Sequence, residues 1–424
     1  MINKKNFLVL LLLAGMLISL FGAPYGDLQI VNNTLSDVNG KAIQLKGWSQ
    51  LDLMQADTAW VPGSTIPNLK ALCPNLNAVR LAMYTEEFGF GYMEQNASGK
   101  ENYRNRIKAL INDAIAANIY VVVDWHILND KDPWSNNYYN ESRAFFEDIA
   151  QTFSDSDNIL FELCNEPKQV SFTGTIKPYA EHVLAGIRKY SDNIVIVGTP
   201  TWSQDIDQVV GNKISSNLGR GVMYALHFYA ATHYQWLRDK GQNALNGGVP
   251  VMLSEWGTVS ASGDGSIDLG NSGTWMDWAD QHNISWFNWS WSVRRESSAS
   301  ISNGSLSGPW SSGNLSQSGQ WVLNRLNSWN TPPPVVNETP TPYVEPPTPT
   351  PTATAYVNNC QGDVNRNGTV DIVDALQIAR YYVGLIQPEE IDLNCANVNC
   401  DGNINIVDAL LIAQYYVGLI NGFC

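Results

Sequence analysis

Basic residues are scarce in this sequence and are never clustered. Lys and Arg number 25 against 40 Asp and Glu, which gives a formal net charge of −15. Binding to a nucleic-acid backbone needs a basic face, so this charge balance argues against nucleic acid as a partner. A Gly-rich phosphate loop is also missing after the first predicted strand, which argues against a nucleotide-binding fold.

Long apolar runs are scarce as well. The one extended run, residues 7–21, follows Lys4 and Lys5 and ends at the small residues Gly22 and Ala23. A membrane span needs about 20 apolar residues, so the run is too short, and its layout is that of a secretory signal peptide. We therefore predict a signal peptide over residues 1–23, with the cleavage point left open, and a secreted, extracellular mature protein outside the membrane.

Cysteine is sparse in the first three hundred residues, where only Cys73 and Cys164 occur. The other four lie in the last sixty-five residues: Cys360, Cys395, Cys400 and Cys424. An exported protein can oxidise such a group. Four cysteines allow three pairings and the sequence does not choose among them, although a Cys360–Cys424 clasp is the preferred prediction.

Aromatic residues, by contrast, are abundant. The chain has 15 Trp and 18 Tyr, and 44% of its 424 residues are hydrophobic. That fraction is enough for a large core, and many of the aromatic residues must belong to it. Aromatic residues that the core does not need could stack with their flat rings on the apolar faces of sugars.

Apolar, strand-like runs alternate with helix-like stretches over residues 24–330. The runs are IQLKGWS, NAVRLAMY, IYVVVDWH, NILFELCNEP, NIVIVG, VMYALHFY, VPVMLSEWG and ISWFNWSW. Helical spacing of apolar residues is found in residues 103–118 and 176–190. Eight such units in roughly 300 residues predict an α/β fold, a (β/α)8 TIM barrel, which typically takes about 250 residues. A hairpin before the first strand, followed by a turn at Asn39-Gly40 that leads into that strand, is expected to close the bottom of the barrel.

Two of these runs end in a glutamate. NILFELCNEP delivers Glu166 and VPVMLSEWG delivers Glu255. A lone Glu after a strand is often a solvated loop residue. In a parallel barrel, however, the carboxyl ends of the strands form the active face, so a pair of carboxylates there predicts proton transfer and nucleophilic attack.

Other strand ends also carry polar or aromatic side chains that could serve a reaction. Each alone is as readily structural as functional, because structural networks also hold ionisable residues. Their common placement at one mouth of the predicted barrel favours a site. They are Arg80, His126, Asn165, His227, Tyr229 and Trp289.

At this point the chain resembles glycoside hydrolase family five, and within it the bacterial endoglucanases. The resemblance rests on motifs that occur in order across residues 25–330: NAVRLAMYTEE, YVVVDWHILNDKDP, NEP, TWSQDI, MYALHFYAATH, SEWG and NWSWSVRRESS. It implies that Glu166 is the general acid and base, that Glu255 is the nucleophile, and that anomeric configuration is retained. It implies no cofactor for catalysis and β-glucan as the substrate.

The chemistry of a retaining hydrolase agrees with this assignment, because it needs two carboxyl groups about 5–5.5 Å apart, one protonated and one ionised. Arg80 and Tyr229 are expected to keep Glu255 ionised by charge and hydrogen bonding. Asn165 would bond the sugar 2-hydroxyl, and His227 would line the same subsite. The substrate-binding residues that the resemblance implies are Tyr84, His126, Trp289, Ala261, Ser262, Arg294 and Glu296.

The chain departs from the family pattern in two places. After the first strand, residues 49–55 read SQLDLMQ and lack the His and Trp that relatives carry there, which puts one substrate contact in doubt. Arg294 stands where a Lys is usual, and a planar guanidinium does not reproduce the geometry of an ammonium group.

A Pro/Thr-rich stretch over residues 331–358 separates a second domain, residues 359–424. Such a composition cannot bury a core and predicts an extended, semi-rigid linker. In the second domain IVDALQIARYYVGLI, residues 372–386, recurs as IVDALLIAQYYVGLI, residues 406–420. This is an internal duplication.

Each copy follows a loop of the EF-hand type, with oxygen-bearing side chains at the calcium-ligand positions and Gly368 or Gly402 at the turn. The second loop begins with Asn397 where Asp is the better ligand. A single loop of this kind could be a fortuitous Asx-rich turn, but duplication makes that reading improbable. The predicted ligands are Asp363, Asn365, Asn367, Asp371 and Asp374, then Asn397, Asn399, Asp401, Asn405 and Asp408.

The second domain resembles a dockerin, the calcium-dependent module that attaches secreted hydrolases to the cohesin modules of a scaffold protein. Asp at the twelfth loop position, in place of the Glu of ordinary EF-hands, is part of the resemblance. It implies bound calcium, a small all-α fold, and a location on a cellulosome or cell surface. It also implies that partner specificity depends on Ile372, Val373, Ile406 and Val407.

Three alternatives stay open. The same barrel and carboxylate pair serve β-mannanases and mixed-linkage glucanases, which differ only in their subsites. A noncatalytic carbohydrate-binding protein is a further reading, which the presence of both glutamates with Arg80, Asn165 and Tyr229 disfavours. The second domain could be a calcium-stabilised cap without a partner. The leading hypothesis is a secreted endo-β-1,4-glucanase, a cellulase, that docks to a cellulosome scaffold.

Overall fold

A computed structural model describes residues 23–328 and 361–423. Within these ranges it leaves out residues 88, 129–131, 136–137, 216–217, 220, 383–385, 389–390 and 418. Most of the predicted signal peptide, the linker, Cys360 and Cys424 therefore lie outside the described residues. The chain divides into two compact units, Met1–Val336 and Asn337–Cys424, and each is described by itself.

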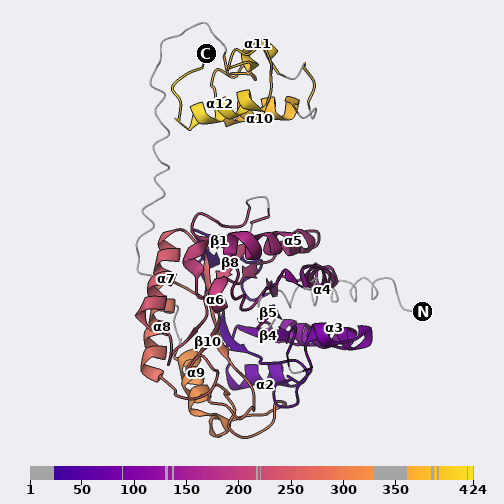
Figure 1. The fold of residues 1–424 in the computed structure, drawn as a ribbon, viewed down its shortest axis with the longest axis vertical. Helices are drawn as coiled ribbons and strands as arrows, with labels where there is room; N and C mark the ends of the chain where they lie inside the picture. Colours follow the sequence, from indigo (N-terminus) through magenta and orange to yellow (C-terminus); the bar gives the residue numbers. More distant parts are fainter. Residues whose placement is uncertain are drawn as a thin grey trace, which may run out of the picture. The chain divides into compact units, whose positions relative to one another are not determined.

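The first unit is a closed barrel of parallel strands (Figure 1). Each strand pairs with the next in sequence, and β11 pairs with β3 to close the ring. The short strand β9, Phe228–Tyr229, continues β8 after a break and also pairs with β10. The predicted TIM barrel is therefore confirmed. Its strands are β3 Lys46–Ser49, β4 Ala78–Tyr84, β5 Tyr120–His126, β6 Ile159–Glu162, β7 Val195–Val197, β8 Val222–Ala225, β10 Val251–Gly257 and β11 Trp286–Trp289.

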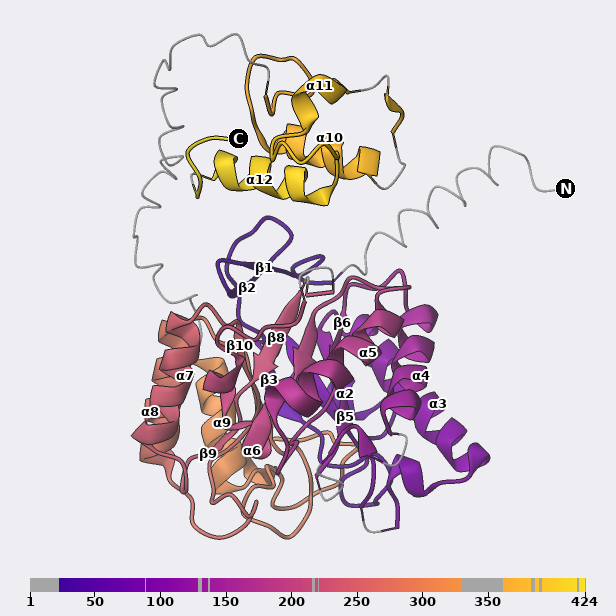
Figure 2. The ribbon, with the colours of Figure 1, turned by 45° about the horizontal axis from the view of Figure 1, so that its top comes forward.

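Helices surround the strands (Figure 2). They are α2 Thr65–Leu72, α3 Ala97–Ala116, α4 Tyr138–Thr152, α5 Lys177–Ile187, α6 Pro200–Ser203, α7 Gln235–Asn246, α8 Leu269–Gln281 and α9 Gln317–Asn327. Short helical turns add Tyr92–Glu94, Phe172–Ile176, Ile206–Val209 and Ser312–Asn314. Helix α3 begins six residues earlier than its apolar spacing predicts, because the Asn96 side chain accepts a hydrogen bond from the Gly99 N–H and caps it. In the described part of the chain, no helix has the length and apolar composition of a membrane span.

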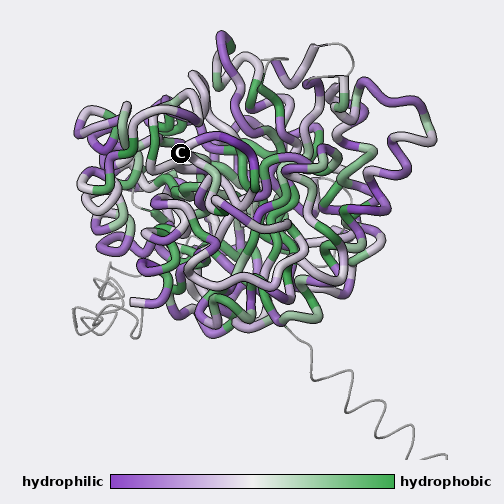
Figure 3. Tube along the Cα trace, turned by 90° about the horizontal axis from the view of Figure 1, so that it is seen from below, coloured by the Kyte–Doolittle hydropathy of each residue, from purple (hydrophilic) through white to green (hydrophobic). Residues whose placement is uncertain are grey.

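Alternation along the strands decides which side chains enter the barrel. On β5, Val121, Val123 and Trp125 pack outward against the helices, so that Asp124 and His126 face inward. Figure 3 shows hydrophobic and hydrophilic stretches interleaved along the trace, with hydrophilic stretches common on its outermost turns. The inward positions of the strands are thus free to carry polar groups without breaking the outer core.

A hairpin of β1, Gln29–Val31, and β2, Thr34–Ser36, covers one end of the barrel. Leu28 and Leu35 pack there in one cluster with inward-facing residues such as Tyr120 and Met252. The hairpin turns at Asn32–Asn33, which both have positive φ, while Asn39–Gly40 makes a second turn further on. With this end closed, the cavity can open only at the carboxyl ends of the strands.

The second unit consists of α10, Ile372–Tyr382, α11, Leu393–Ala396, and α12, Ile406–Tyr416. Helices α10 and α12 pack against each other, and equivalent residues of the two copies form the centre of the core. These are Ala375 and Ile378 in the first copy and Ala409 and Ile412 in the second. Neither helix has a core without the other, so the duplication is what makes the unit compact.

Candidate active site

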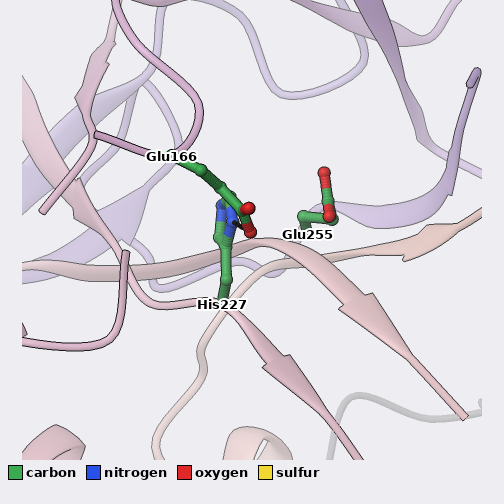
Figure 4. A group of neighbouring side chains, drawn as sticks. All are labelled: Glu166, His227 and Glu255. Carbon is green, nitrogen blue, oxygen red and sulfur yellow. Dashed lines mark hydrogen bonds and ion pairs between the residues drawn. The ribbon is translucent and has the colours of Figure 1, made fainter. Parts of the chain in front are cut away.

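Glu166 and Glu255 lie together at the carboxyl ends of the barrel strands. Glu255 is part of β10, and Glu166 follows β6 by four residues. A carboxylate oxygen of each and a ring nitrogen of His227 lie within 4.8 Å of one another. Figure 4 shows the three side chains converging from separate segments. Both glutamates are buried, with exposures of 8% for Glu166 and 3% for Glu255.

Glu255 has one partner for each carboxylate oxygen. The guanidinium of Arg80 lies 3.1 Å from Oε2, and the Tyr229 hydroxyl donates a 2.7 Å hydrogen bond to Oε1. Arg80 is fully buried beneath the cavity. A buried carboxylate with a buried cation and a hydroxyl donor is stabilised in its charged form.

Glu166 has a different partner, the imidazole of His227. Nδ1 of His227 lies 3.0 Å from Oε1 of Glu166, and Nε2 lies 2.9 Å from the Ser254 hydroxyl. Burial lowers the pKa of His227, but the nearby carboxylates of Glu162, Glu166 and Glu255 outweigh it and raise that pKa to about 9. At neutral pH His227 is therefore an imidazolium that donates to Glu166.

Two further carboxylates, Asp124 and Glu162, lie beneath this pair. Arg80 contacts Glu162 at 2.7 Å and Asp124 at 2.9 Å, and both acids are fully buried. Burial raises the pKa of Glu162, but the charges of Arg80 and His227 prevail and bring it to about 2. Burial raises the pKa of Asp124 well above its ordinary value. Sequence reasoning missed both acids, although a charge inside an apolar run signals a buried partner.

Asn165 and His126 are fixed by the same network. Arg80 donates to the side-chain oxygen Oδ1 of Asn165 at 2.7 Å, and the side-chain NH₂ of Asn165 donates to the backbone carbonyl of Ile127 at 3.2 Å. Nδ1 of His126 lies 2.6 Å from Asp124. Burial lowers the pKa of His126 to about 3, so this ring is neutral where His227 is charged.

A cavity of about 530 Å³ opens above the two glutamates. The catalytic and substrate-binding residues predicted from the sequence all line this cavity, except Arg80, which lies beneath it. The predicted lining residues are Tyr84, His126, Asn165, Glu166, His227, Tyr229, Glu255, Ala261, Ser262, Trp289, Arg294 and Glu296. Sequence reasoning did not single out Leu51, Leu128, Trp202, Gln204, His233 and Gly263.

Aromatic rings form one wall of this cavity. The rings of His126 and Trp289 stack with centroids 5.3 Å apart, and Tyr84 packs on His126 at 4.2 Å. Trp289 is only 6% exposed, so its ring is held in place rather than free to swing. Arg294 pairs with Glu296 at 3.3 Å at the rim.

The loop that lacks the expected His and Trp presents Leu51 to the cavity instead. Asp52 holds the loop, because its carboxylate accepts the backbone N–H groups of Met54 and Gln55 at 2.7 and 2.8 Å. An apolar side chain cannot replace the hydrogen bond of an imidazole. This rim of the cavity is therefore less polar than the family pattern implies.

The two EF-hand-like loops of the second unit have matching geometry. Asp374 Oδ1 accepts the N–H groups of Val364 and Asn365, and Asp408 Oδ1 accepts those of Val398 and Asn399. Both aspartates are fully buried. In each loop the glycine at the turn, Gly368 or Gly402, has positive φ. The Asn397 side-chain oxygen is buried, and among the described residues it has no hydrogen-bond partner.

The cysteines divide as their positions suggest. Cys73 and Cys164 are both buried in the barrel. Cys395 and Cys400 are each disulfide-bonded. The Cys360–Cys424 clasp stays a prediction, because both residues lie outside the described part of the chain.

A parallel barrel that brings two carboxylates together at its strand ends, in a cavity with aromatic walls, defines the class: the protein is a glycoside hydrolase. The chain belongs to glycosyl hydrolase family 5, the cellulase family, whose sequence profile matches residues 36–295. Residues 361–416 match the dockerin type I domain. The resemblances to this family and to a dockerin are both confirmed.

Among curated relatives, an endoglucanase of Clostridium saccharobutylicum is 38% identical over 344 residues, covering 77% of this chain and 73% of the relative. Endoglucanase 5 of Pectobacterium carotovorum subsp. carotovorum is 38% identical over 311 residues, covering 72% and 58%. The catalytic domain of Thermobifida fusca endoglucanase Cel5A superposes with a TM-score of 0.65 at 32% identity, covering 72% of this chain and 98% of that one.

Proposed function

We propose that this chain is a secreted endo-β-1,4-glucanase that hydrolyses cellulose and related β-glucans with retention of configuration. The observation that carries the proposal is the spacing of the carboxylates, because an oxygen of Glu166 lies within 4.8 Å of an oxygen of Glu255. A retaining pair is about 5–5.5 Å apart, whereas an inverting pair is about 6.5–9.5 Å apart to admit a water molecule. The close spacing supports direct attack by one carboxylate.

Glu255 is the nucleophile in this proposal. Its carboxylate attacks the anomeric carbon while Glu166 gives its proton to the departing glycosidic oxygen, which leaves a glycosyl ester on Glu255. Glu166 then takes a proton from water, the water oxygen attacks the same carbon, and Glu255 departs as a carboxylate. Arg80 and Tyr229, at 3.1 and 2.7 Å, stabilise the charge of the Glu255 carboxylate before the ester forms and again when hydrolysis releases it.

The remaining residues orient the sugar and the acid. Asn165 is fixed by Arg80, so it is preorganised to bond the 2-hydroxyl of the sugar that is attacked. His227, charged and hydrogen-bonded to Glu166, fixes the direction of the acid. Trp289 is the platform beneath the sugar, with Tyr84 and His126 beside it. The glucan chain is contacted further along the cavity by Ala261, Ser262, Arg294 and Glu296.

A panel of soluble polysaccharides with product sizing tests the substrate and the endo action together. Carboxymethylcellulose and β-glucan should lose viscosity quickly and release short oligosaccharides, while mannan is cut poorly. Faster turnover of galactomannan than of any glucan would make the protein a β-mannanase. Binding of glucan without any cleavage would support the noncatalytic alternative.

We further propose that the second unit binds calcium and docks to a cohesin. Asp374 and Asp408 are buried carboxylates, and among the described residues neither has a basic side chain as a partner, so a cation fits both positions. Asp363, Asn365, Asn367 and Asp371 would complete the first site. Asn397, Asn399, Asp401 and Asn405 would complete the second. Calcium would neutralise the acids and fix both loops.

The cohesin contact is proposed for the start of the two helices. Ile372, Val373, Ile406 and Val407 are all exposed, between 45% and 50%, and occupy equivalent positions of the two copies. The test is capture of the full chain on immobilised cohesins encoded by the source organism, with calcium and then with chelator. No capture by any of them would leave a calcium-stabilised cap without a partner.

A further inference from the structure

Two aromatic side chains are exposed where helix α7 begins, outside the cavity described above. Tyr234 and Trp236 are each 47% exposed. The ring of Trp236 meets that of His233 edge to face, with centroids 5.7 Å apart, and His233 lines the cavity. The exposed ring of Trp236 is therefore continuous with the wall of the cleft.

Trp236 is also held in place. The ammonium group of Lys240, one helical turn further along α7, lies 5.7 Å from the centre of its ring. Lys240 forms an ion pair with Asp205, whose carboxylate accepts a 2.7 Å hydrogen bond from the Thr201 hydroxyl. A cation over one face of an indole restrains the ring and leaves the other face available for stacking.

Thr201 belongs to the turn that carries a second cleft tryptophan, Trp202. Residues Thr201 to Ser203 all have positive φ, between 55° and 59°, which turns the Trp202 ring out to 40% exposure at the cavity. The backbone N–H of Trp202 donates to the carbonyl of Pro167 at 3.2 Å. Trp202 is therefore anchored next to Glu166, and the Asp205–Lys240 pair connects its turn to Trp236.

This placement fixes the side of the cleft to which Trp236 belongs. Glu166 gives its proton to the departing sugar, so residues anchored beside Glu166 border the leaving-group side. We propose that Trp236 is a distal aromatic platform on that side, which stacks with glucose units of a long β-glucan beyond those held in the cavity. The inference rests on the proposed function and names the polymer chain itself as the ligand.

The test compares two substrates with the full chain and its Trp236→Ala variant. An aryl β-cellobioside fills only the side of the cleft opposite the platform and the position of its aryl group, whereas cellohexaose extends across the leaving-group side. For Trp236→Ala, kcat/KM on cellohexaose should fall about three- to tenfold, mainly through KM, because one stacking contact is lost. On the aryl β-cellobioside it should not change.

Two further variants serve as controls. Trp236→Tyr keeps a flat ring and should restore most of the activity on cellohexaose. Trp134→Ala removes a tryptophan of similar exposure, 41%, that stacks on Tyr139 and does not line the cavity, and it should leave both substrates unaffected. Three outcomes would each contradict the role of Trp236 as a platform. These are equal losses on both substrates, an equal loss in the Trp134→Ala control, and no loss on cellohexaose.

A binding measurement separates this inference from the proposed function. Calorimetric titration of cellohexaose into the Glu255→Gln variant, with and without Trp236→Ala, should show affinity reduced by a similar factor in the double variant. Wild-type chain that binds cellohexaose through Trp236 but hydrolyses no glucan would contradict the proposed activity alone. Wild-type hydrolysis with unchanged binding in the double variant would contradict the platform alone.

Discussion

The barrel and the dockerin both bury carboxylates, but they neutralise them differently. In the barrel, Asp124, Glu162 and Glu255 surround Arg80, and His227 bridges towards Glu166. In the dockerin, Asp374 and Asp408 are just as buried, yet in the described residues their partners are backbone N–H groups. The barrel has its counter-charges in its own sequence, whereas we propose that the dockerin takes them from solution as calcium.

This difference bears on what each region does. A site that stabilises charge during a reaction has to be formed before the substrate arrives, because reorganisation during the reaction is costly. A docking module has no such requirement, so its fold can depend on a cation. We therefore expect the barrel to be indifferent to calcium and sensitive to its internal ion pairs, and the dockerin to show the reverse.

The largest effect should come from the two glutamates of the barrel. Glu255→Gln and Glu166→Gln should each lower hydrolysis of β-glucan by about 10²- to 10⁴-fold or more with the fold intact. Only Glu166→Gln should be partly spared on aryl glycosides, since a good leaving group needs no proton. Calcium binding and cohesin capture should be unchanged in both variants. Similar rates for the two variants on aryl glycosides would contradict the assignment of Glu166 as the acid and Glu255 as the nucleophile.

Removal of calcium should affect only the dockerin. Without the cation, the acids of each loop repel one another and α10 and α12 lose their fixed connection, so the unit should lose helix and become sensitive to protease. Glucanase activity and the unfolding transition of the barrel should stay constant. The experiment is run with chelator and with reductant, since Cys395 and Cys400 are disulfide-bonded. A dockerin that stays folded under both treatments would show that its fold, like that of the barrel, does not depend on calcium.

Loss of one internal cation should affect only the barrel. Arg80→Met removes the buried cation that contacts Asp124, Glu162 and Glu255 and should lower the free energy of unfolding by about 3–5 kcal/mol. Arg366→Met is the matched control in the dockerin, because the Arg366 side chain is 70% exposed where it pairs with Asp392. Because an exposed ion pair contributes little to stability, that change should leave the unfolding transition of the dockerin nearly unchanged. Equal shifts in the two thermal transitions would show that burial does not distinguish the pairs.

The sequence predicted the frame of the barrel better than the network inside it. Apolar runs ending in polar residues identified Glu166, Glu255 and the barrel itself, because strand order and strand ends follow from local pattern. The sequence did not reveal Asp124 and Glu162 as part of the site. Both acids pair with Arg80, and only the folding of the barrel brings Arg80 near them. Trp202 reaches the cavity because residues 201–203 adopt left-handed backbone conformations, and the residue types at these positions do not predict such conformations.

The pH dependence of stability should also differ between the regions. His227 has a pKa of about 9 in the folded barrel, raised from 6.5. Its contribution is fully present below pH 6.5 and is lost as pH rises through 9, which amounts to about 3 kcal/mol. Residues 361–423 contain no histidine. Over pH 6.5–9 the barrel transition should therefore fall while that of the calcium-loaded dockerin stays level, and His227→Gln should flatten the barrel curve.

The most direct test of the central claim is the configuration of the first product. Proton magnetic resonance of β-glucan or cellohexaose hydrolysis, recorded before mutarotation equilibrates the ends, distinguishes the two outcomes. Direct attack by Glu255 predicts that the β-anomer appears first and decays towards equilibrium. An α-anomer formed first would mean that water attacks in a single displacement, and it would contradict the double displacement assigned to Glu166 and Glu255.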